Sequence, residues 1–349
     1  MKTLAAFLLI LALATLACGL DFNPPPLSFT QPAPQPSSPP IIIQATQTAN
    51  PTSVPPSPTV TAPAPTETVR PTQAAPTATE TQPSPTLTIN QLRNASIEVR
   101  GSDQILRTAT LIDGKYEANS DSTQPDYVIA TVGDKFAFGD LNGDGLEDAV
   151  MILGENVGGT GEFVSLITFL NQGGQPVYTS RAEIEDRAQV QSLDIQNDEI
   201  LLNIIVHGPG DPQCCASLVS TRNYRLIENA LVLSRLTTVT SSNSERIIQI
   251  VSPVNGTQVS GAFILLGSVS ISPFENNLVY TVYTQNGTTA LDQGGFTIQG
   301  DGLGGPGTFE LPLNFANIGL QGPVRIQIAD ISAADGSYLA INTVFLVLK

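Results

Sequence analysis

The pattern of apolar and polar positions divides this chain into two kinds of sequence. From about residue 97 onward, short apolar runs alternate with turn residues such as Asp113-Gly114 and Asn286-Gly287. Runs rich in Val, Ile, Tyr and Phe, bounded by turn signals, are typical of β-strands. Residues 19–90 show no such periodicity. The pattern therefore predicts a mainly β body that follows a segment without a hydrophobic core.

The pattern of residues 91–240 predicts one β-rich or α+β domain. Short helices are expected near residues 89–95 and 182–188, and no helical pattern runs for more than three turns. We expect strands at residues 107–112, 127–132, 149–153, 163–170, 190–195, 200–206 and 223–226.

The pattern of residues 247–349 predicts an immunoglobulin-like β-sandwich. The segment contains several short apolar runs separated by turns, as expected for two packed sheets. The apolar runs lie at residues 247–251, 263–269, 274–278, 279–283, 296–298, 308–313, 324–329 and 343–348.

This second segment also carries a resemblance. Gly267 after an apolar run, Phe274-Glu275-Asn276, and Phe309-Glu310 before another run resemble the bacterial spore germination immunoglobulin-like domain. The resemblance covers residues 247–349. Because this segment has no Cys or His and few clustered carboxylates, we expect it to be an adhesive or spacer module. The tryptophan that is frequent in that family is absent, since the chain has no Trp.

Residues 1–18 have the composition of an export signal: Lys2, an apolar run, and then Cys18. The run has the length of a signal peptide and is too short to span a bilayer. Residues 14–19, Ala-Thr-Leu-Ala-Cys-Gly, resemble the bacterial lipobox, which implies that Cys18 becomes the lipid-modified first residue of the mature protein. Thr15 and Leu16 depart from the usual lipobox residues, so the alternative is ordinary cleavage and secretion.

The composition of residues 19–90 predicts a disordered Pro/Thr-rich linker. They hold 18 of the chain's 27 prolines and only four charged side chains, Asp21, Glu67, Arg70 and Glu80. Proline-rich chains favour the extended polyproline II conformation, at about 3.1 Å per residue. Such a linker would act as a spacer that holds the β body away from a membrane.

The charge of the chain narrows the partners that we expect. The formal net charge is −16, which argues against nucleic acid, because a nucleic-acid binder needs a basic face. One His and three Cys also exclude a multi-histidine metal centre and a disulfide-rich scaffold.

The most specific motif is the run from Asp140 to Asp148. Oxygen ligands at Asp140, Asn142, Asp144 and Asp148, with the backbone carbonyl of Leu146, have the spacing of a calcium loop. The bidentate Glu that ends an EF-hand is missing, and the loop resembles instead the calcium loop of integrin-type FG-GAP repeats. Only one copy is present, so a propeller is not implied. The alternative is an Asx-rich turn that folds without metal.

A second motif runs from His207 to Cys215 and holds the only His and the only Cys pair, Cys214 and Cys215. Three interpretations remain open: a disulfide between the neighbouring cysteines, a zinc or soft-metal site with His207, and a structured loop with buried thiols. Neighbouring Cα atoms lie closer together than the usual disulfide range of about 4.4–6.8 Å, so such a bond would be easily reduced.

The motifs at residues 138–145, 158–161 and 207–215 together resemble an uncharacterised domain of bacterial envelope lipoproteins, which implies a compartment and no particular activity. We therefore expect a non-enzymatic protein outside the cytoplasm, lipid-anchored to the membrane, that binds an unknown protein or cell-wall polymer. The alternatives are a hydrolase that uses acidic residues at 140–148 or at Glu183–Asp186, and a redox or metal sensor at the His207, Cys214 and Cys215 loop.

Overall fold

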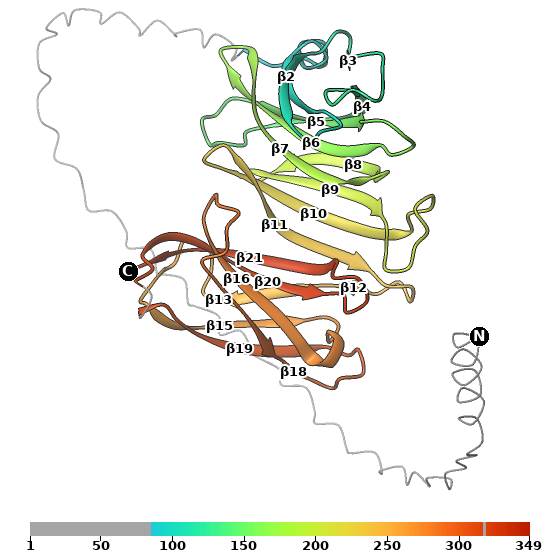
Figure 1. The fold of residues 1–349 in the computed structure, drawn as a ribbon. Helices are drawn as coiled ribbons and strands as arrows, with labels where there is room; N and C mark the ends of the chain where they lie inside the picture. The colour runs from blue at the N-terminus through green and yellow to red at the C-terminus, as the bar shows by residue number, and fades with distance from the viewer. Residues whose placement is uncertain (1–84, 317–318) are drawn as a thin grey trace, which may run out of the picture. The chain divides into compact units, whose positions relative to one another are not determined.

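The structure, a computed structural model, describes residues 85–316 and 319–349, which belong to one compact unit. The predicted signal peptide, Cys18 and most of the predicted linker lie outside these residues. The described part is mainly β and contains several antiparallel sheets, as the pattern predicts (Figure 1). None of its helices has the length and apolar content that a membrane crossing needs.

A five-stranded antiparallel meander forms the first sheet. Its strands follow one another in sequence order: β3 (Lys115–Ala118), β4 (Val128–Gly139), β5 (Asp148–Asn156), β6 (Phe163–Gln172) and β7 (Gln175–Asp186). The central strands β5 and β6 read as continuous apolar runs because both of their faces are buried. Met151 points into one core, whereas Val150 and Ile152 point into a second core on the opposite face.

Different elements pack against the two faces of this sheet (Figure 1). One face packs against the short helix α2 (Ile89–Leu92) and the hairpin of β1 (Ser96–Arg100) and β2 (Leu106–Thr110). Thr88 caps α2 in a capping box with Gln91, which explains why the helix begins there. The other face packs against β8 (Gln189–Gln196), β9 (Glu199–Val206), β10 (Leu218–Ile227) and β11 (Ala230–Val239).

The C-terminal segment forms the predicted two-sheet sandwich. One sheet contains β17 (Asp292–Thr297), β16 (Asn277–Thr284), β20 (Gly322–Ile331) and β21 (Tyr338–Leu348). The facing sheet contains β13 (Ile248–Ser252), β15 (Ala262–Val269), β19 (Gly307–Asn314) and β18 (Gln299–Gly300). Buried aliphatic and phenylalanine side chains of both sheets fill the space between them.

The two predicted β domains share one sheet. Strand β11 pairs with β21 through Arg235↔Asn342 and Leu236↔Ile341, which joins β8–β11 to the sandwich sheet. The hydroxyl of Thr238 donates to the carbonyl of Leu339 at 2.7 Å across the same line. We call this line between β11 and β21 the seam. Two short strands, β12 (Glu245–Arg246) beside β11 and β14 (Gln258–Val259) beside β21, complete the sheet.

Two expectations about local structure are wrong. The helix expected near residues 182–188 is the end of strand β7, where apolar and charged positions alternate with the period of a strand. The predicted linker was expected to extend to residue 90, but Leu87 is already buried and α2 begins at Ile89. Strand β11 had no predicted counterpart.

Candidate functional site

The loop at residues 140–148 connects β4 to β5 and is closed by its own backbone. The Asp140 carboxylate accepts hydrogen bonds from three backbone N–H groups of the following turn, at 3.2, 2.7 and 2.8 Å. Burial raises the pKa of Asp140, but these three donors outweigh burial and hold that pKa below its ordinary value. The side chains of Asn142 and Asp144 each accept from a backbone N–H two residues later. These contacts are Asx turns.

Asp148 plays a different role from the rest of the loop. Its side chain is fully buried, and its two oxygens accept from the backbone N–H groups of Leu141 and Asn171, both at 2.9 Å. Burial raises the pKa of Asp148, and the neighbouring charges of Asp144 and Asp140 act in the same direction. Asp148 therefore ties the loop to the end of strand β6.

The described oxygens of this loop contact backbone N–H groups. Asp140, Asn142 and Asp144 lie in one turn, but their oxygens accept backbone hydrogen bonds, and Asp148 points into the protein interior. Among the residues that the structure describes, no group of three or more His, Cys, Asp or Glu side chains is placed to hold a metal ion. Calcium binding at Asp140–Asp148, with the Leu146 carbonyl, stays a prediction from the sequence.

The second predicted motif forms the loop between β9 and β10. The backbone N–H of His207 and its ring Nδ1 both lie 2.6 Å from Oε1 of Glu185, and its Nε2 lies 3.1 Å from the carbonyl oxygen of Gln213. The hydrogen bond to Glu185 raises the pKa of His207. Asp211 accepts from the backbone N–H groups of Gly208 and Ser217, both at 2.8 Å.

Arg187, just after β7, joins this loop to two other segments. Its guanidinium donates to the carboxylate of Asp186 at 2.6 Å, to the carbonyl of Thr160 at 2.9 Å and to the carbonyl of Gln213 at 3.1 Å. A pocket of about 470 Å³ opens beside Arg187. We call the segments 157–162, 185–188 and 207–217, held together in this way, the three-loop cluster.

Cys214 and Cys215 are joined to each other by a disulfide, and both are exposed. The expectation of a loop with buried thiols therefore differs from the structure. A zinc site at His207, Cys214 and Cys215 is also disfavoured, because zinc binds thiolates and both sulfurs are here bonded to each other.

Of the acidic residues that suggested a hydrolase, those at Glu183–Asp186 each contact a basic side chain. Glu183 lies 2.7 Å from Arg100, Glu185 contacts His207, and Asp186 contacts Arg187. A glycosidase needs two carboxyl groups that face one another across the substrate. Among the contacts that the structure describes, these three carboxylates contact cations and not one another.

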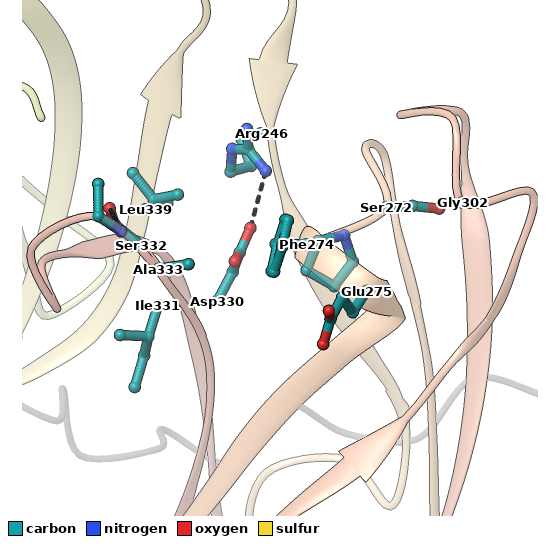
Figure 2. A pocket seen from close by; sticks show the side chains of 12 residues that line it. Arg246, Ser272, Phe274, Glu275, Gly302, Asp330, Ile331, Ser332, Ala333 and Leu339 are labelled. Carbon is teal, nitrogen blue, oxygen red and sulfur yellow. Dashed lines mark hydrogen bonds and ion pairs between the residues drawn. The ribbon is translucent and has the colours of Figure 1, made fainter. Parts of the chain in front are cut away.

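A pocket that sequence reasoning missed lies at one end of the sandwich (Figure 2). It has a volume of about 620 Å³, within the usual range of ligand pockets. Arg246 of β12 donates to Asp330 of β20 at 2.8 Å, and this ion pair lies between the ring of Phe274 and the side of the pocket that carries Leu339 (Figure 2). Burial raises the pKa of Asp330, although Arg246 opposes the shift. We call this site the Arg246 pocket.

The rim of the Arg246 pocket is apolar and acidic. Phe274 is 67% exposed, which is unusual for a phenylalanine. The next two residues, Glu275 and Asn276, have positive φ angles of 54° and 59°, a conformation that costs non-glycine residues energy and is frequent at ligand clamps. Within the described residues, Glu275 forms no hydrogen bond or ion pair with another side chain, so its charge is available.

The residues of this pocket come from distant parts of the sequence. Arg246 belongs to the short connection between the two predicted domains, Phe274 follows a proline, and Asp330 ends a strand. The only local signal was the Phe-Glu-Asn run at residues 274–276, which the sequence assigned to a family resemblance and not to a site.

Comparison with known proteins identifies no family for the chain. No family model matches it, and no curated protein matches it. The resemblances to the spore germination immunoglobulin-like domain and to the envelope lipoprotein domain therefore stay predictions.

Proposed function

We propose that this chain is a non-enzymatic, lipid-anchored protein of the bacterial cell envelope that binds a partner outside the cytoplasm through the Arg246 pocket. The observation that carries the binding role is the pocket itself. It combines an exposed aromatic ring at Phe274, an ion pair, and the carboxylate of Glu275. Exposed aromatic side chains beside a concave surface are typical anchors of protein interfaces.

The charges of the pocket favour a basic partner. Asp330 neutralises Arg246, so that the net charge of the lining is that of Glu275. The chain as a whole carries a net charge of −16, which attracts cations at a distance. We therefore infer that the partner is a polypeptide segment with a Lys or Arg side chain for Glu275 and an apolar side chain for the face of Phe274.

The anchoring role rests on the sequence at Cys18 and on the proline-rich linker after it. Stable membrane attachment generally takes more than one acyl chain, and the lipidated cysteine of a lipobox protein carries several. A spacer after this residue would allow the β body to reach a partner away from the membrane surface.

Photocrosslinking in the cells that make the protein tests the binding role. A photoreactive phenylalanine analogue replaces Phe274, and the matched control places it at Val254, which is 66% exposed. We expect a discrete adduct from position 274, none from position 254, and loss of the adduct in a Glu275→Lys background. An adduct that survives Glu275→Lys, or equal adducts from both positions, contradicts the proposed site.

Metabolic labelling with an alkyne fatty acid tests the anchor separately. We expect label on the wild-type chain and none on Cys18→Ala, with the variant released from the membrane fraction. An unlabelled wild-type chain inside the cytoplasm contradicts the proposed location.

A further inference from the structure

The disulfide between Cys214 and Cys215 should contribute little to the stability of the fold. A disulfide stabilises a fold chiefly by closing a loop of the unfolded chain, and the effect grows with the length of that loop. Here the sequence separation is 1, so that almost no chain is closed. Both residues are exposed, which leaves the sulfurs accessible to an attacking thiolate. The bond is therefore placed for reaction rather than for stability.

The loop that carries the two cysteines is held in shape by other contacts. The Asp211 carboxylate accepts from the backbone N–H of Gly208 and from both the N–H and the hydroxyl of Ser217, all at 2.8–3.0 Å. These bonds join the two ends of the loop without using the disulfide. Opening the bond should leave this frame in place.

The residue before the cysteines is also fixed. The carbonyl oxygen of Gln213 lies 3.1 Å from a guanidinium nitrogen of Arg187 and 3.1 Å from Nε2 of His207. Because the backbone on one side of Cys214 is clamped and the frame at Asp211 persists, the two sulfurs would remain neighbours after reduction. A preorganised pair of thiols closes again readily when the disulfide of the small thiol takes up the two electrons, so the reaction would be reversible.

The charges around the loop select among thiols. Glu162, Glu185, Asp186 and Asp211 carry negative charges, whereas Arg187 carries a positive one, as does His207 when it is protonated. The cluster is thus net negative, as is the whole chain at −16. An anionic thiol is repelled by this field and a cationic thiol is attracted.

We propose that Cys214–Cys215 is a thiol–disulfide exchange site for low-molecular-weight thiols that are neutral or cationic. A thiolate attacks one cysteine sulfur, the bond between the two cysteines breaks, and the departing cysteine sulfur takes a proton from water. The product is a mixed disulfide. A second thiol then attacks the mixed disulfide, which leaves two cysteine thiols and a free disulfide of the small thiol, so that two electrons pass from the thiols to the protein.

The test uses the full chain with Cys18→Ser, which leaves Cys214 and Cys215 as the only cysteines. The folded protein is incubated with millimolar cysteamine, 2-mercaptoethanol or reduced glutathione, quenched with N-ethylmaleimide, and weighed by mass spectrometry. We expect a mixed disulfide and then two alkylated thiols without loss of the native fold. After correction by the rates for the urea-unfolded chain, cysteamine should react at least about threefold faster than glutathione at low salt, and the ratio should fall in high salt.

A variant distinguishes a site that the fold preorganises from a disulfide that is only exposed to solvent. In Asp211→Ala the frame is lost, and we expect the reduced pair to close several-fold more slowly when cystamine, the disulfide of cysteamine, is added as the oxidant. The control is Asp121→Ala, which removes a similar carboxylate that accepts from Thr123 in another exposed turn. The proposal is overturned if the bond opens only when urea unfolds the chain, if the three thiols show no charge preference, or if Asp211→Ala and Asp121→Ala behave alike.

Discussion

Replacing Arg181 of strand β7 should destabilise the protein more than a change at the surface, because this side chain compensates the buried charge of Glu155. Arg181 pairs with Glu155 of β5, and the two side chains are 8% and 1% exposed. The guanidinium donates to both oxygens of Glu155, at 3.1 and 2.5 Å, and also to the hydroxyl of Ser165 at 2.7 Å and the carbonyl of Glu98 at 3.1 Å. In Arg181→Met, the carboxylate of Glu155 keeps one donor, the backbone N–H of Arg100 at 2.8 Å.

The size of the effect follows from this loss. Removing one partner of a buried ion pair leaves an uncompensated charge and costs about 3–5 kcal/mol. The double variant Arg181→Met with Glu155→Leu removes both charges, and such apolar replacements are often near neutral. The double variant should therefore be more stable than Arg181→Met alone.

Urea unfolding of a form that begins at Gly19, followed by circular dichroism, measures these changes. Lys135→Met is the matched control, since it breaks an ion pair with Asp134, which is 84% exposed. We expect the control to change the free energy of unfolding by less than about 1 kcal/mol. If Arg181→Met costs no more than the control, or if the double variant is no more stable than Arg181→Met, the description of this pair as a buried charge with several compensating bonds is refuted.

Four further predictions concern single residues or the loop at residues 140–148. Gly267→Ala should lower the free energy of unfolding by about 1–3 kcal/mol, because a β-carbon there would lie 2.2 Å from the ring of Phe309. The control in the same urea assay is Gly295→Ala, which should be close to neutral because the nearest neighbour of its β-carbon lies at 3.9 Å. The raised pKa of His207 adds stability that is complete below its ordinary value of 6.5 and lost as the pH rises through the raised value. His207→Gln should therefore flatten the fall in melting temperature as the pH rises above 6.5, and an unchanged slope would refute the pairing. Asp148→Asn should cost about 1–3 kcal/mol, since one of two buried backbone donors loses its acceptor. If calcium binds the loop, millimolar calcium should raise the melting temperature and Asp144→Ala should abolish the rise, whereas a metal-free turn gives no shift.

The fold could be predicted from the sequence where one physical signal dominates. Strands β5 and β6 read as strands because they are apolar on both faces. Strand β7 was not recognised, because its charged positions at Arg181, Glu183 and Glu185 look like a solvated helix until their partners on other elements are known. Sequence periodicity reports the polarity of each position but not which distant residue neutralises a charge.

The candidate sites show the same division. The loops at residues 140–148 and 207–217 were predicted because each is a contiguous run of turn and chemically active residues. The Arg246 pocket could not be predicted, since its ion pair joins residues 84 positions apart. Nor does spacing alone show that Asp148 points inward to a backbone N–H of Asn171, a contact that only the packing of β6 against β5 creates.

The Arg246 pocket lies beside the seam between β11 and β21. Arg246 lies on β12, which pairs with β11, whereas Asp330 lies on β20, which pairs with β21. The ion pair at the floor of the pocket therefore spans the seam, which itself consists of only two residue pairs. This ion pair and the bond from Thr238 to Leu339 add to the contact across the line. Buried side chains of Leu236, Ala329 and Ile341 also pack together across it. A ligand that engaged Asp330 or Arg246 would therefore contact an ion pair that joins the two halves of the sheet.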